Sequence, residues 1–115
     1  MNIAVVRGTL SRAPEVRALP SGDEVASLEV TVAPHEAQDR AESVPVSVAD
    51  PPGWLRDLEP GDEVAVLGRV RRRFFKAGPS TQSRTEVVAE RVVPAGQRRR
   101  VDALLSAAET RLRRP

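Results

Sequence analysis

The sequence contains no cysteine and no tyrosine, and only one histidine, one tryptophan and two phenylalanines. Without cysteine, neither a disulfide framework nor a thiolate metal site can form, which is typical of an intracellular protein. No stretch approaches the roughly 20 apolar residues that a membrane helix needs, and the first residues lack the apolar core of a signal peptide. We therefore expect a cytoplasmic protein without membrane contact.

Residues suited to catalysis are equally scarce. The single histidine, His35, lies in a polar segment with no second ligand or base beside it. No serine lies in a nucleophile-elbow pattern, no glycine run resembles a phosphate loop, and the acidic residues are scattered. We predict that the protein is not an enzyme and uses no catalytic residue, metal or cofactor.

The 115 residues suffice for one compact domain, and their net charge of +2 is unevenly distributed. Residues 1–94 carry 12 basic and 14 acidic groups, whereas residues 95–115 carry 6 basic and 2 acidic groups. Any affinity for a polyanion must therefore come from local patches. All but one of the 18 basic residues are arginine, which binds phosphate through paired donors and stacks on bases. An arginine-rich genome would produce the same bias.

The most informative segment is Gly61–Phe75, which reads GDEVAVLGRVRRRFF. Successive side chains of a strand point to opposite faces, so the pattern predicts an inward apolar face and an outward basic face. The apolar face comprises Val64, Val66, Gly68 and Val70, and the basic face comprises Arg69, Arg71 and Arg73 and leads to Phe75. A basic strand face is suited to phosphate, although such a face also serves simply to keep a strand edge in solvent.

The remaining pattern predicts an all-β fold. Further strands are expected at Asn2–Leu10, Glu24–Ala33, Ser43–Ala49 and Thr85–Val93. A short helix is expected after Asp50, with Trp54 closing the end of the barrel, and Lys76–Arg84 is expected to be a mobile hairpin loop. The order of strand, strand, strand, helix, strand, strand fits a five-stranded Greek-key barrel with a short helix between strands three and four.

The chain changes character after residue 94, which separates a domain at 1–94 from a segment at 95–115. Arg98, Arg99 and Arg100 are predicted to form a solvated basic linker. The apolar residues Val101, Leu104, Leu105, Ala108 and Leu112 lie on one stripe of a predicted C-terminal helix. A helix this short is marginal alone, so it should dock on its own barrel, on another subunit or on a different protein.

Three regions carry a family resemblance. Asn2–Gly22 (NIAVVRGTLSRAPEVRALPSG) contains an Asn, an apolar run, a Gly, a Leu, a Pro-Glu-hydrophobic-Arg sequence and a Pro-Ser-Gly turn. Together with Leu58–Phe75 and Thr85–Val93, which look like its fourth and fifth strands, this region resembles the bacterial single-stranded-DNA-binding protein family. The resemblance implies an OB-fold, usually a homotetramer, that binds single-stranded DNA without base specificity in replication, recombination or repair.

The resemblance also implies which residues contact DNA. Phosphate contacts are expected from Arg7, Arg17, Arg69, Arg71 and Arg73, and base stacking from Phe75. Arg12 has weaker support, and surface solubility is the alternative for the arginines of the first hairpin. Phe74 has the opposite parity to Phe75 and is expected in the core.

The sequence departs from the family in two respects. The family stacks bases on several aromatics, whereas Phe75 alone occupies such a position here, so we expect weaker binding. The chain ends in RLRRP rather than an acidic tip, so we do not expect enzyme recruitment through such a tip. An oligomeric adaptor that binds a protein partner, and an RNA-binding protein, remain alternatives, and self-association as a dimer or tetramer is expected.

Overall fold

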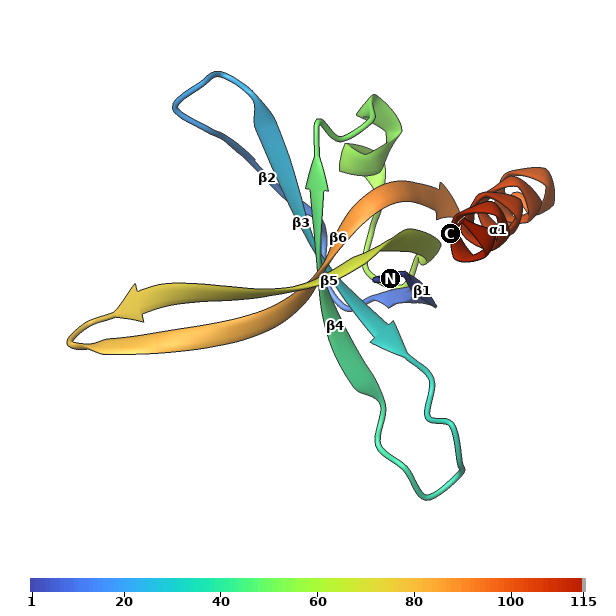
Figure 1. Cartoon of the computed structure of the whole chain (residues 1–115), viewed down its shortest axis with the longest axis horizontal. Coiled ribbons are helices and arrows are strands. Elements are labelled where there is room, and N and C mark those ends of the chain that lie inside the picture. Colours follow the sequence, from blue (N-terminus) through green and yellow to red (C-terminus); the bar gives the residue numbers. More distant parts are fainter. Residues whose placement is uncertain (115) are drawn as a thin grey trace.

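The computed structural model describes residues 1–114. It contains β1 (Ala4–Leu10), β2 (Glu15–Ala18), β3 (Glu24–Val32), β4 (Glu42–Ala49), the 3-10 helix η1 (Gly53–Asp57), β5 (Glu63–Ala77), β6 (Ser80–Pro94) and α1 (Arg98–Arg113). The strands form one sheet in the order β1-β5-β6-β4-β3-β2, and an additional β1–β3 pairing closes it into a barrel. Figure 1 shows the β5–β6 hairpin projecting from the side opposite α1.

The core lies inside this barrel and is built from the alternating apolar residues of the strands. Ala26 and Leu28 of β3, Val46 of β4 and Val64 of β5 are almost fully buried in it. Gly68 is required where β5 passes β6, because a Cβ at this position would overlap the backbone carbonyl of Val88. The five predicted strands are therefore present, with their expected apolar faces inward.

Two short elements differ from the prediction. The predicted helix after Asp50 is only the five-residue 3-10 helix η1, which lies between Pro52 and Pro60 and has no room for further turns. Its Leu55 is fully buried and Trp54 packs against the core, as expected of residues that close the barrel. An additional strand, β2, lies between the first two predicted strands and pairs along β3. Its four residues are too few to reveal an alternation.

The predicted mobile loop at Lys76–Arg84 is wrong. β5 and β6 continue through this segment as a paired ribbon and are joined by the two-residue turn Gly78-Pro79. Gly78 has φ of +63°, which suits the first central position of a type II′ turn. We call residues 71–86 the arm, because this part of the hairpin extends beyond the barrel (Figure 1).

The C-terminal helix docks on its own barrel. Leu104 and Ala108 of α1 are buried against Ala65 and Leu67 of β5 and Val93 of β6. Both faces of β5 are therefore buried beside α1. At the edge of the barrel, by contrast, Val70 lies opposite the buried Val87 but is itself 45% exposed, so its predicted burial is wrong. Arg98, Arg99 and Arg100 form the first turn of α1 rather than a linker. Within residues 1–114, no helix has the length and apolarity that a membrane crossing requires.

Candidate nucleic-acid interface

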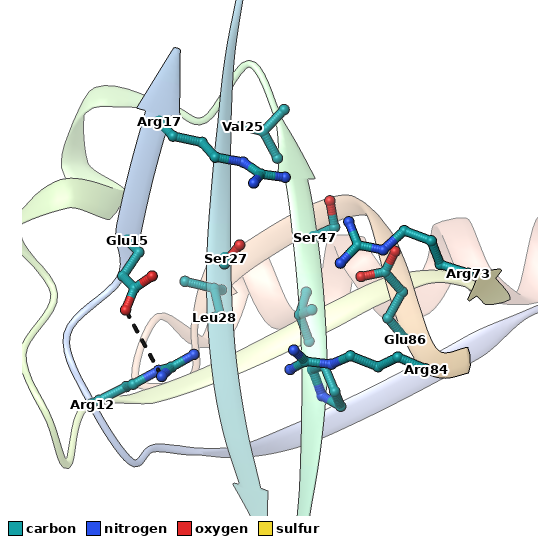
Figure 2. Close-up of a pocket in the computed structure, with 12 residues that line it drawn as sticks. Arg12, Glu15, Arg17, Val25, Ser27, Leu28, Ser47, Arg73, Arg84 and Glu86 are labelled. Atoms are coloured by element: carbon teal, nitrogen blue, oxygen red, sulfur yellow. Dashed lines mark ion pairs between the residues drawn. The ribbon is translucent and has the colours of Figure 1, made fainter. Parts of the chain in front are cut away.

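Four arginines converge on a depression of about 190 Å³ on the outer face of the sheet. Arg12 and Arg17 reach it from the β1–β2 side, and Arg73 and Arg84 reach it from the arm. Figure 2 shows the guanidinium groups of the two pairs extending toward one another across β3 and β4. The depression is thus bounded by cations that are up to 72 residues apart in the sequence, from Arg12 to Arg84.

The strand register explains why these groups share one face. Glu15 of β2 lies opposite Ser27 of β3, and Ser27 lies opposite Ser47 of β4. Directly opposed residues in a sheet point to the same side, so these side chains form a continuous outer surface. Ala26 and Leu28, which alternate with Ser27, are buried in the core. The polar floor of the depression is therefore a direct consequence of strand alternation.

One ion pair joins the arm to this surface, and a second lies within the base of the arm. Arg84 lies 3.3 Å from a carboxylate oxygen of Glu29 on β3, and Arg12 lies 3.8 Å from the same oxygen. Arg71 donates to Glu86, whose side chain is only 7% exposed. A buried carboxylate is costly unless a cation pairs with it, so Arg71 compensates the charge of Glu86.

Arg17 and Arg73 differ from these paired arginines. Within residues 1–114, neither makes a salt bridge with an acidic residue. Both line the depression and point into it (Figure 2). A guanidinium group can bind a phosphate through two parallel hydrogen bonds. These two arginines can accept a phosphate without first giving up a carboxylate.

An aromatic ring lies farther along the same face of the arm. Phe75 is 38% exposed, and the guanidinium carbon of Arg73 lies 6.0 Å from the ring centroid, within the range of a cation–π contact. Phe74, expected in the core, is 67% exposed on the opposite face, so that prediction is wrong. Phe74 and Phe75 do point to opposite faces, as predicted, but beyond the barrel no core covers either face of the ribbon.

The other predicted site residues lie outside the depression. Arg69 is exposed on β5 opposite Val88 and does not line it. Arg7 donates to Glu63 at 2.8 Å and lines a separate hollow beside Thr31. The structure therefore brings Arg17 and Arg73 together, places Arg71 and Phe75 on the adjoining arm, and leaves Arg7 and Arg69 apart.

Sequence reasoning missed Arg84 and gave Arg12 little weight. Arg84 fell in the supposed loop, although its spacing of two residues from Glu86 would place both on one face of a strand. Arg12 follows β1 in a connection whose direction no periodicity fixes. Among the described residues 1–114, no three His, Cys, Asp or Glu side chains are grouped so as to hold a metal ion.

Comparisons with known proteins agree with this architecture. A family model described as the single-strand binding protein family matches residues 1–95. Two solved structures, the wild-type single-stranded DNA binding protein from Thermus aquaticus and a deletion mutant of it, are each similar at 25% identity and a TM-score of 0.67. Each alignment covers 82% of this chain and 40% of the Thermus chain, so this chain matches less than half of those proteins. No curated protein matches the sequence.

Proposed function

Because this chain belongs to the single-strand binding protein family, we propose that it binds single-stranded DNA with little sequence preference. The observation that carries the proposal is the convergence of Arg12, Arg17, Arg73 and Arg84 on one depression of the outer sheet face. In OB-fold proteins, the outer face of the central strands and the loops that flank it bind oligonucleotides. The depression occupies the corresponding face, with the arm as one wall.

Phosphate binding would begin at Arg17 and Arg73. These two guanidinium groups face each other across β3 and β4 and have no carboxylate partner within residues 1–114. Arg84 would join them by exchanging Glu29 for a phosphate, and Arg12 by giving up Glu15 and Glu29. Both partners are anions, and phosphate binding releases counterions from the DNA, so this exchange is favoured at low salt. Arg7, Arg69 and Arg71 would extend the cationic track at its margins.

Phe75 would supply the base contact. Stacking of one base on an aromatic ring contributes about 1–3 kcal/mol, whichever base is involved. Only this ring lies on the same face as Arg73, so electrostatic contacts would dominate the affinity. If about five cations engage, the log-log dependence of affinity on salt has a slope of roughly −3.5, at about 0.7 ions released per phosphate.

The wider role follows from family membership. We propose a non-enzymatic protein that associates with itself as a dimer or tetramer, is cytoplasmic, and serves replication, recombination or repair. We also propose that the barrel at 1–94 supplies the DNA-binding unit and that residues 95–115 form a separate supporting segment. The adaptor alternative is not favoured, because the helix assigned to a protein partner instead buries Leu104 and Ala108 on its own barrel.

The test is an anisotropy titration of labelled oligo(dT) at low salt. We expect micromolar or tighter binding by the unaltered protein and its loss in Arg73→Glu/Phe75→Ala. Arg113→Glu is the matched control, because it makes the same charge change at an exposed position of α1. Absence of binding at low salt would refute the proposal. Competition with a matched RNA oligomer decides between DNA and RNA, since a single stacking ring does not exclude a 2′-hydroxyl.

A further inference from the structure

The arm has a second face that the proposed site does not use. Opposed residues share a face, and the reverse face contains the pairs Arg72–Thr85, Phe74–Ser83 and Lys76–Thr81. All six of these side chains are exposed, and none is acidic. We call this set the reverse face of the arm. It presents an aromatic ring with one cation on each side.

The exposure of Phe74 needs an explanation. At 67% exposed, its ring is one of the most solvent-accessible large apolar side chains of the described chain. Single exposed apolar residues are common on protein surfaces, but aromatic rings are the most costly to leave in water. On this ribbon the ring is flanked by Arg72 and Lys76 two residues away on each side. The surroundings of the ring are therefore cationic rather than apolar.

Arg72 is held in a defined position beside the ring. Its Nε and Nη2 donate to the hydroxyl oxygen of Ser83 at 3.1 and 3.0 Å. Its guanidinium carbon lies 5.9 Å from the centroid of the Phe74 ring. The front face repeats this arrangement, with Arg73 at 6.0 Å from the centroid of the Phe75 ring. Each face of the arm thus carries an arginine and a phenylalanine spaced two residues apart.

We infer that the reverse face is a second contact for single-stranded nucleic acid, an inference that rests on the proposed function. A base would stack on Phe74, and Arg72 and Lys76 would contact the phosphates on either side of it. The arm would then lie between two segments of one bound strand. The front face would hold one segment against the depression, and the reverse face would hold the other.

The tip of the arm permits this path. Phe74 and Phe75 point to opposite sides, so one short segment cannot stack on both rings. The turn at Gly78-Pro79 begins three residues beyond Phe75, which is about 10 Å at 3.3 Å per strand residue. The two turn residues carry no charged or bulky side chain. A strand that leaves Phe75 can therefore pass round the tip and return along Phe74.

Charge favours nucleic acid over a second copy of this chain. If the reverse faces of two copies met, their Arg72 and Lys76 side chains would be brought together without a carboxylate from either face. Like charges placed opposite each other in paired strands are destabilising. The cores of protein interfaces are also depleted in charged residues, whereas both neighbours of Phe74 on this face are cations. A polyanion matches the surface without either penalty.

The inference is tested with full-length Phe74→Ala and Phe75→Ala and two lengths of labelled oligo(dT). The shorter has about 8 nucleotides, within the site size of one OB fold, and the longer has about 30. We expect Phe75→Ala to weaken binding to both lengths, and Phe74→Ala to weaken binding roughly 10-fold to the longer one only. Leu112→Ala, which removes a side chain of similar exposure from α1, is the control and should change neither.

Photo-crosslinking provides a second readout. With 5-iodouracil in the long oligonucleotide, Phe75→Ala protein should still crosslink within the tryptic peptide 74–76, because Phe74 remains. The inference fails if Phe74→Ala changes the affinity for neither oligonucleotide and the peptide 74–76 carries no crosslink. The proposed function still stands in that case, provided that the unaltered protein binds DNA and Phe75→Ala weakens that binding. A change in solution mass caused by Phe74→Ala, with DNA affinity unchanged, would identify a self-association surface and also overturn the inference. If the unaltered protein binds neither length, the proposed function itself fails.

Discussion

Arg71 donates two hydrogen bonds to the same carboxylate oxygen of Glu86, from Nη2 at 2.5 Å and from Nε at 3.2 Å. Glu86 is 6% exposed, and the two residues lie directly opposite each other where the arm leaves the barrel. Removing one member of such a pair leaves a buried charge without compensation. The pair therefore fixes the base of the arm, and with it the direction in which Arg73 points.

Arg71→Ala should lower the free energy of unfolding by about 2–3 kcal/mol, somewhat below the range for fully buried pairs because Arg71 is 40% exposed. Urea denaturation monitored by circular dichroism measures the loss. Arg73→Ala, two residues along the same strand and without an acidic partner in residues 1–114, should cost less than about 0.5 kcal/mol. Equal losses in the two variants would show that Glu86 does not depend on Arg71.

Glu29→Gln should strengthen DNA binding several-fold at low salt. The Glu29 carboxylate lies within 4 Å of both Arg12 and Arg84, so it competes with phosphate for two cations of the depression. The amide keeps the shape of the side chain and removes the competing charge. Glu109→Gln is the control, because Glu109 pairs with Arg113 on α1. Unchanged or weaker binding by Glu29→Gln would indicate that Arg12 and Arg84 do not contact DNA.

Leu104→Ala should destabilise the protein by about 2–5 kcal/mol, because Leu104 is 1% exposed between α1 and the barrel. Leu105→Ala is the matched control. It changes the adjacent residue, which is 50% exposed, and should cost less than about 1 kcal/mol. Thermal denaturation compares the two. Similar costs would mean that α1 does not dock through the Leu104 side.

Arg100→Ala should change the emission of Trp54, the only tryptophan. The guanidinium carbon of Arg100 lies 5.3 Å from the Trp54 ring and covers it from the first turn of α1. Removing that cover exposes the indole to water, so we expect a red shift of the emission maximum. Arg99→Ala, one residue earlier in the same turn, should leave the spectrum unchanged. A spectrum insensitive to both would place Arg100 away from the indole.

The periodicity of apolar residues predicted much of the fold, because a strand or helix that is buried on one side must carry apolar residues at regular intervals. The apolar residues at Val64, Val66 and their counterparts on other strands had to face a core, and the stripe through Leu104 and Ala108 had to meet another surface. The outer part of the arm, residues 76–84, was missed because it contains no large apolar residue, so no alternation marks it as a strand. Parity alone placed Phe74 in a core that does not extend along the arm.

The site was only partly predictable. Arg73 could be assigned from the basic stripe and Arg17 from the family resemblance, since both lie in recognisable segments. Their convergence with Arg12 and Arg84 depends on the pairing of β2, β3, β4 and β6, and on the register of the arm. These pairings join residues distant in the chain, and no local pattern encodes them. The same pairing leaves Arg7 beside Glu63, outside the depression.

Whether DNA enters the depression between Arg17 and Arg73 is tested most directly by the salt dependence of oligo(dT) binding, measured for the unaltered protein and for Arg17→Ala/Arg73→Ala. We predict a log-log slope of roughly −3.5 for the unaltered protein, which falls in magnitude by about 1.4 in the double variant, at about 0.7 per lost phosphate contact. An unchanged slope, with affinity equal to that of the unaltered protein, would show that DNA does not enter the depression between these two arginines.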